Sequence, residues 1–244
     1  NMKRMQTIFI IGMILLCATP VESLRGVRTS KTLMSSLAHS FEPVLSKQEE
    51  YLNLSELLQA CWSFASVLRE MGQTVLAYDF ENNIRKAETL YHSAPSEQRR
   101  SLASLLKLER ETGIHGPHGA LQDQSAATGL LWLRRYLEFH LDMYSSILAS
   151  RDPTDAALNA YKTTIEPFHG WTLRKLFTMK LSTMMPGRRD LLVLLGNFKS
   201  QEFGEEEEQI ILEDLDNLVS IWRPIVVKWR ATYEDLDLED FRRA

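Results

Sequence analysis

The stretch YLNLSELLQACWSFASVL, residues 51–68, decides the fold class, because its apolar side chains recur every three or four residues. That spacing puts them on one face of an α-helix, whereas a strand would alternate them between two faces. Ser46 and Glu49 just upstream have the spacing of a capping box, which predicts the helix start, and Gly72 lies near its expected end. The stretch therefore predicts an amphipathic helix with one buried face.

The remaining chain has the same helical character. Only 11 glycines and 8 prolines occur among 244 residues, and neither a hairpin signal nor an internal repeat is present, which argues against a β fold. A loop is expected at HGPHGA, residues 115–120, and Pro224 is expected to kink the last helix. Further helices are expected over about 73–92, 96–113, 125–150 and 189–198. One more is expected to begin at Asp152-Pro153, one to end before Pro186-Gly187, and the last to begin at GEEEE, residues 204–208. The sequence predicts one all-α domain of about eight helices.

The first residues have the pattern of a secretory signal peptide, expected over 1–23. Lys3 and Arg4 precede an apolar run, which is shorter than the ~20 apolar residues that span a bilayer. A buried N-terminal helix and an uncleaved anchor are the alternatives. Residues 24–40 are basic and rich in serine and threonine, so we expect a poorly structured lead-in before a folded domain over 41–244. If the signal is used, the protein enters the secretory pathway or is secreted, and the glycosylation sequon at Asn53 becomes relevant.

Charge and motifs exclude several function classes. The formal net charge is −4, and −5 without residues 1–23 (26 basic against 31 acidic side chains), which does not favour nucleic-acid binding. Cys61 is then the single cysteine, so an internal disulfide is not expected. His115 and His118 lie in a loop without cysteine partners, so no metal site is expected. No nucleophile elbow, zinc-protease pair or phosphate-binding loop is present, and we expect no catalytic residue and no cofactor.

One helical face carries a polar cluster within YDFENNIRKAETLY, residues 78–91. Asp79, Asn83 and Lys86 stand at positions i, i+4 and i+7, which places all three on the same face. A carboxylate, an amide and an ammonium together offer donors and acceptors that suit hydroxyl groups. The simpler interpretation is that Asp79 and Lys86 are ordinary surface charges, and the cluster alone favours that interpretation.

Two further stretches place aromatic rings beside polar groups. In GLLWLRRYLEFH, residues 129–140, Trp132 is either a core residue or a stacking surface for a sugar ring. In IEPFHGWTLRKLF, residues 165–177, His169 can make one well-placed hydrogen bond, although a lone histidine is more often structural. Trp171 suits either a core or a membrane interface. None of these residues identifies a site alone.

Taken together and in this order, three motifs resemble the glycolipid transfer protein family. They are D-x-x-x-N-x-x-K at Asp79, Asn83 and Lys86, L-L-W-L-x-R at residues 130–135, and H-G-W at residues 169–171. The resemblance covers roughly residues 40–240 and assigns 41–244 to a glycolipid transfer protein domain. It implies a two-layer helical sandwich with a hydrophobic pocket, non-enzymatic transfer of a glycosphingolipid or other sphingolipid between membranes, and transient membrane contact. The resembled family is cytoplasmic, which is the alternative to secretion.

The resemblance also implies a role for individual residues. Asp79, Asn83, Lys86, Trp132 and His169 would bind the sugar headgroup and the ceramide amide. Trp171 and Lys175 would contact the membrane, and Phe177 and Leu181 would line the pocket for the hydrocarbon chains.

The identity of the headgroup stays open at this point. Ceramide-1-phosphate carriers of the same fold use a lysine and arginines where this chain has Asn83, Trp132 and Thr128, which favours a sugar. Nearby Arg85, Arg134 and Arg135 keep the phosphate alternative open. A lipid-sensing or partner-binding helical module is a further alternative, and the sequence leaves the oligomeric state unknown.

Overall fold

The computed structural model describes residues 32–45, 51–117 and 119–243, and these form nine α-helices, three short 3₁₀-helices and no strand. The predicted signal peptide, Ser46, Glu49 and His118 lie outside the described residues. The helices are α2 (Leu33–Phe41), α3 (Leu54–Glu70), α4 (Thr74–Ser93), α5 (Leu102–Glu111), α6 (Ala126–Leu148), α7 (Pro153–Thr164), α8 (Trp171–Met184), α9 (Arg188–Gly196) and α10 (Glu205–Asp235). The predicted all-α class is confirmed.

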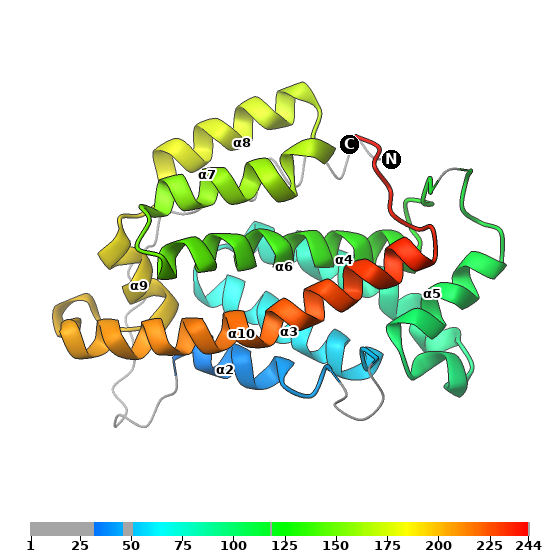
Figure 1. Cartoon of the computed structure of the whole chain (residues 1–244), viewed down its shortest axis with the longest axis horizontal. Coiled ribbons are helices and arrows are strands. Elements are labelled where there is room, and N and C mark those ends of the chain that lie inside the picture. The colour runs from blue at the N-terminus through cyan, green and yellow to red at the C-terminus, as the bar shows by residue number, and fades with distance from the viewer. Residues whose placement is uncertain (1–31, 46–50, 118, 244) are drawn as a thin grey trace.

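Helix α6 lies at the centre of the fold and packs against α4, α7 and α10. Figure 1 shows α7 and α8 stacked on one side of α6, with α10, α3 and α2 on the other. Trp222 of α10 is fully buried and contacts the rings of Phe41, Phe64 and Tyr144, which come from α2, α3 and α6. This aromatic cluster joins α2, α3 and α10 to the central helix. Helix α10 continues through Pro224 as one helix.

Capping side chains explain where several helices begin. Ser125 accepts a hydrogen bond from the Thr128 amide of α6, and Asp152 accepts hydrogen bonds from two amides in the first turn of α7. Both helices begin close to where the sequence predicts. Helix α3, however, begins at Leu54, because Asn53 is its N-cap and accepts a hydrogen bond from the Glu56 amide at 3.3 Å. The prediction that this helix follows a capping box at Ser46 was therefore wrong.

The predicted lead-in over 24–40 was wrong for its second half, because residues from Leu33 onward form helix α2. Thr32 caps this helix and also donates a hydrogen bond to Asp214 of α10 at 2.6 Å. The helix buries its apolar face against α3 and α10. The serines and threonines of this segment made its short amphipathic pattern hard to recognise, and the helix is stabilised by contacts with residues distant in sequence.

Among the described residues, no helix is long and apolar enough to cross a membrane.

Candidate functional site

The polar cluster of α4 is buried rather than exposed to solvent. Asp79 and Asn83 are 5% and 1% exposed, and Lys86 is half-buried. Asn83 donates a hydrogen bond from Nδ2 to the Asp79 carbonyl at 3.1 Å, and Lys86 donates from Nζ to Asn83 Oδ1 at 3.1 Å. The structure therefore brings the three predicted residues together as a hydrogen-bonded group, which is not the arrangement of ordinary surface charges.

Burial changes the acid–base properties of this cluster. It raises the pKa of Asp79, although the hydrogen bond from Tyr136 and the charge of Lys86 oppose the rise. Burial also lowers the pKa of Lys86, and the carboxylates of Asp79 and Asp123 oppose that change. Burying charged groups costs free energy that a core has no need to bear, so this cluster is a candidate binding site.

Gly129 allows α6 to approach this cluster closely. A β-carbon at that position would lie 2.4 Å from the Asn83 carbonyl oxygen and 3.0 Å from the Lys86 β-carbon. Only a residue without a side chain permits this separation between α4 and α6. The sequence analysis did not single out Gly129, because its role depends on a neighbour 46 residues away.

Tyr136 is a second residue that the sequence analysis missed. Its hydroxyl donates a hydrogen bond to Asp79 Oδ2 at 2.7 Å, and both groups are buried. Tyr136 lies four residues after Trp132 and therefore on the same face of α6. The spacing of Trp132 and Tyr136 was available in the sequence as a signal.

Trp132 and His169 form the opposite side of the candidate site. Their rings stack at an angle of 29°, with centroids 6.4 Å apart. Tyr161 pairs with His169 across 3.0 Å, from its hydroxyl to Nδ1, and was also missed by the sequence analysis. Burial, helped by the positive charges of Arg174 and Arg135, lowers the pKa of His169 to about 4. His169 is therefore neutral at pH 7 and can either donate or accept a hydrogen bond, depending on its tautomer.

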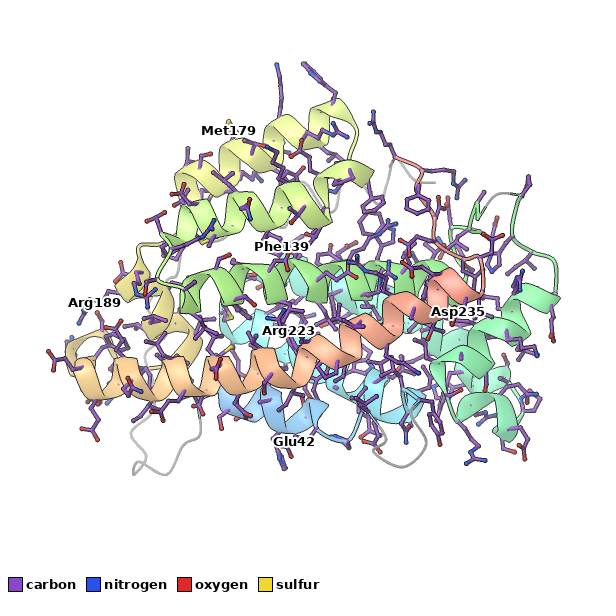
Figure 2. All side chains as sticks on the ribbon, in the orientation of Figure 1. Glu42, Phe139, Met179, Arg189, Arg223 and Asp235 are labelled. Atoms are coloured by element: carbon purple, nitrogen blue, oxygen red, sulfur yellow. The ribbon has the colours of Figure 1, made fainter. Side chains whose placement is uncertain are left out.

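An apolar cavity opens beneath these polar groups, between α6 and the pair α7 and α8. It encloses about 750 Å³ of space free of protein atoms, including its open mouth. Figure 2 shows Phe139 on the α7 side of α6, toward this cavity. The lining is Met71, Gln73, Leu76, Tyr136, Phe139, His140, Met143, Tyr144, Tyr161, Ile165, Phe177, Leu181, Met185 and Leu191. Both predicted pocket residues, Phe177 and Leu181, are among them.

Tyr136 and Tyr161 connect the cavity to the polar residues. Each tyrosine lines the cavity, and each hydroxyl reaches one predicted headgroup residue, Asp79 or His169. A ligand with one polar end and a hydrocarbon body would fit this arrangement, because apolar walls hold the body while buried polar groups orient the other end.

Trp171 and Lys175 lie outside the cavity, on the exposed side of α8. Trp171 is 70% exposed, and the Lys175 ammonium stands 4.1 Å from the centroid of its ring. Met179, two turns further along α8, is also exposed and lies on the outer helix of the molecule (Figure 2). Gly170 caps α8 with φ −67°, a backbone conformation open to any residue, so conformational freedom does not explain that glycine.

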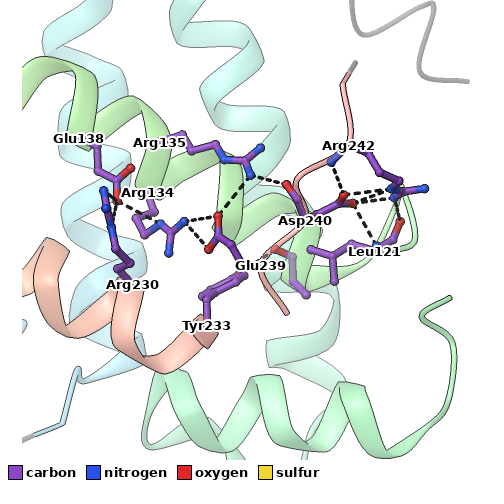
Figure 3. A network of polar contacts seen from close by, with 10 residues as sticks. Leu121, Arg134, Arg135, Glu138, Arg230, Tyr233, Glu239, Asp240 and Arg242 are labelled. Atoms are coloured by element: carbon purple, nitrogen blue, oxygen red, sulfur yellow. Dashed lines mark hydrogen bonds and ion pairs between the residues drawn. The ribbon is translucent and has the colours of Figure 1, made fainter. Parts of the chain in front are cut away.

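Arg134 and Arg135 are almost fully buried and form ion pairs with a segment that follows α10. Arg134 donates from Nη2 to both carboxylate oxygens of Glu239, at 2.8 and 2.6 Å, and Arg135 contacts the same carboxylate at 3.3 Å (Figure 3). Glu138 pairs with Arg134 and with Arg230 of α10. The arginines that kept a phosphate headgroup open in the sequence analysis therefore already have carboxylate partners.

These features define a class of protein, a helical ligand-binding domain with an apolar cavity and a buried polar cluster at its edge. The described residues contain no group of histidine, cysteine, aspartate and glutamate side chains that could hold a metal ion. The family model for glycolipid transfer protein matches residues 52–197, which is more than half of the chain. The chain belongs to the glycolipid transfer protein family.

The chain is also similar to two curated relatives. It is 28% identical over 212 residues to pleckstrin homology domain-containing family A member 8 of Danio rerio, covering 85% of this chain and 37% of that protein. It is 24% identical over 210 residues to glycolipid transfer protein 3 of Arabidopsis thaliana, covering 82% of this chain and 84% of that protein. The chain thus matches little more than a third of the first relative and most of the second.

Solved structures share the fold. FAPP2, described as selecting simple glycosphingolipids with the GLTP-fold, superimposes with a TM-score of 0.73 at 22% identity, covering 87% of this chain and all of that one. Human ceramide-1-phosphate transfer protein, in complex with 12:0 ceramide-1-phosphate, has the same TM-score at 17% identity, covering 86% and 99%. Fold similarity alone therefore does not distinguish a sugar from a phosphate headgroup.

Proposed function

We propose that this protein binds a sphingolipid with a sugar headgroup and carries it between membranes without changing it chemically. The observation that carries the proposal is the buried cluster of Asp79, Asn83 and Lys86, linked through Tyr136 to an apolar cavity. Membership of a lipid transfer family supports the same function.

The proposed division of roles follows from the energetics. Hydrocarbon chains in the cavity supply most of the affinity, at ~0.8 kcal/mol per buried CH₂ group. That contribution is the same for every headgroup, so it cannot give specificity. Specificity comes from the buried polar groups, since each one left unpaired by the wrong headgroup costs ~1–3 kcal/mol. In this proposal Asp79, Asn83 and Lys86 bind sugar hydroxyls, Trp132 stacks on the sugar, and His169 binds the ceramide amide.

The surroundings of the site favour a sugar over a phosphate. Phosphate recognition needs arginine or lysine with charge to spare. Arg85 is paired with Glu81, and Arg134 and Arg135 are paired with Glu239. Trp132 offers a flat ring instead of a cation.

Exposed residues on α8 support a membrane-docking role for that helix. Trp171 is largely exposed and has Lys175 beside its ring, a combination that suits the headgroup region of a bilayer. In this proposal α8 contacts the membrane briefly while lipid enters or leaves the adjoining cavity.

The proposal is tested by measuring transfer of labelled glucosylceramide between vesicles. Asp79→Val and Trp132→Ala are expected to reduce transfer at least tenfold while helical circular dichroism stays unchanged. Asp216→Val, which removes an exposed carboxylate from α10, and Trp62→Ala on α3 are matched controls that should retain transfer. Normal transfer by both site variants would overturn the site assignment.

Parallel assays separate the alternatives. Faster transfer of ceramide-1-phosphate than of glucosylceramide would indicate a phosphate carrier. Sphingolipid that co-purifies with the protein but is not transferred would indicate a sensing module. Release of free sugar or ceramide from the labelled lipid would indicate hydrolysis and refute non-enzymatic transfer.

A further inference from the structure

The segment over residues 237–243, here called the strap, follows α10 and brings Glu239 and Asp240 to the arginines of α6 (Figure 3). Its Asp240 carboxylate accepts a hydrogen bond from the Leu121 amide at 3.1 Å, and Arg242 donates to the Leu121 carbonyl at 2.7 Å. Arg242 also forms an ion pair with Asp240 at 2.6 Å. These contacts attach the strap to the loop before α6, whereas Glu239 makes its own ion pairs with Arg134 and Arg135.

Arg135 connects the strap to the proposed headgroup residues. Its guanidinium carbon lies 5.1 Å from the Trp132 ring centroid and 3.3 Å from that of Phe168, which immediately precedes His169. Arg135 is only 2% exposed, and its Nε has no hydrogen-bond partner among the described residues. A buried guanidinium with unused hydrogen-bonding capacity therefore stands directly behind the predicted sugar-stacking ring.

The charge around Arg135 depends on Glu239. Three guanidinium groups and two carboxylates form the connected network: Arg134, Arg135 and Arg230 with Glu138 and Glu239. Its net charge is +1, and it would be +2 without the Glu239 carboxylate. An incoming phosphate would compete with this carboxylate for Arg135 and would be repelled by it at close range.

We propose that Glu239 is a specificity-determining residue that excludes anionic headgroups by pairing with Arg134 and Arg135 behind Trp132. The proposal rests on the proposed sphingolipid-binding function and extends it from the cavity to the strap. The strap places a carboxylate where a phosphate headgroup would otherwise find two arginines, so selectivity against ceramide-1-phosphate comes from a residue outside the cavity. A neutral sugar gains nothing from those arginines and is unaffected by the pairing.

The test compares binding of glucosylceramide and ceramide-1-phosphate, each presented in phosphatidylcholine vesicles, by the whole chain and its variants. Glu239→Gln is expected to raise the ratio of ceramide-1-phosphate to glucosylceramide binding at least tenfold. Glu239→Ala removes the charge without adding an amide and should shift the ratio in the same direction. Glu239→Asp keeps the charge and should leave the ratio within about threefold of wild type.

Two further variants test the assignment to charge and to Arg135. Asp240→Asn weakens the attachment of the strap but keeps Glu239, so it should change the ratio little. Combining Arg135→Gln with Glu239→Gln should remove most of the increase in the binding ratio that Glu239→Gln produces alone. The proposal is overturned if Glu239→Gln and Glu239→Ala leave the ratio of ceramide-1-phosphate to glucosylceramide binding unchanged, or if Asp240→Asn raises that ratio as much as they do. In either case, glucosylceramide binding by the wild-type protein would still support the general function. If the wild-type protein binds neither lipid, the general function fails and this inference fails with it.

Discussion

Gly129→Ala should separate α4 from α6 at the candidate site, because the added β-carbon has no room. It would lie 2.4 Å from the Asn83 carbonyl oxygen, whereas ordinary van der Waals contact begins at 3.4 Å. The backbone of α4 must therefore withdraw by 3.4 − 2.4 = 1.0 Å. A flexible side chain could rotate away from the new methyl group, but a backbone carbonyl within a helix cannot.

The expected size of the effect follows from two opposing contributions. Overpacking a well-packed contact costs ~1–3 kcal/mol, and replacing glycine by alanine within a helix returns up to ~1 kcal/mol. The rigid neighbour favours the upper part of the first range, so we expect a net destabilisation of about 1–2 kcal/mol. For a chain of this size that lowers Tm by roughly 2–8 °C. Moving Asn83 and Lys86 by about 1 Å should also weaken their hydrogen bonds to a headgroup, with a loss of ~10-fold in transfer.

Thermal unfolding followed by circular dichroism measures the first effect, and vesicle transfer of glucosylceramide measures the second. Gly187→Ala is the matched control, because its β-carbon would meet no atom within 4 Å. Its transfer should equal that of wild type. If Gly129→Ala retains both the wild-type Tm and the wild-type transfer rate, the close approach of α4 and α6 is not what positions the site.

Three other perturbations test separate parts of the structure. Tyr136→Phe removes the hydroxyl that donates to buried Asp79, and should cost ~1–3 kcal/mol of unfolding free energy in chemical denaturation; no loss would mean that this hydrogen bond is unimportant. Burial lowers the pKa of His140 and His169 to about 4, whereas a histidine in the unfolded chain titrates near 6.5. As pH falls from 7 to 5 the unfolded chain therefore binds more protons than the folded protein, and each histidine should lower the free energy of unfolding by about 2 kcal/mol. A free energy of unfolding that stays constant over this pH range would contradict both pKa shifts. Trp171→Ala should reduce vesicle binding roughly tenfold in flotation assays, because the side chain is 70% exposed and lies outside the cavity. Binding of a dispersed short-chain glycolipid should stay unchanged. Equal losses in both assays would instead indicate that Trp171 takes part in lipid binding.

Local sequence patterns were enough to predict the helices other than α2, and the shared face of the α4 cluster. The spacing of Asp79, Asn83 and Lys86 determines that they project together, whatever the tertiary structure. The starts of α6 and α7 were also predictable from local sequence, and the structure shows Ser125 and Asp152 capping them. What those patterns could not supply was burial, which turns a row of polar side chains into a candidate binding site.

The features that sequence reasoning missed depend on contacts between distant segments. Helix α2 is short and contains polar residues, and its stability comes from packing on α3 and α10. Glu239 and Arg134 are separated by 105 residues, and no local rule pairs them. Tyr161 precedes His169 by only eight residues, but a turn between α7 and α8 brings their polar atoms together. Periodicity describes one helix at a time, whereas these features belong to pairs of elements.

The burial of Asp79 is the strongest physical argument that the cluster serves binding rather than folding. Burial raises the pKa of this carboxyl, so its ionised form destabilises the fold at neutral pH, even though Tyr136 and Lys86 offset part of that cost. Natural cores rarely retain such a group unless it has another role. Asp79→Asn separates the two roles, because the amide still accepts the Tyr136 hydrogen bond while the buried charge is removed. The variant should therefore have a Tm equal to or above that of wild type and still transfer glucosylceramide more slowly. If the carboxylate served only the structure, its replacement would instead lower Tm.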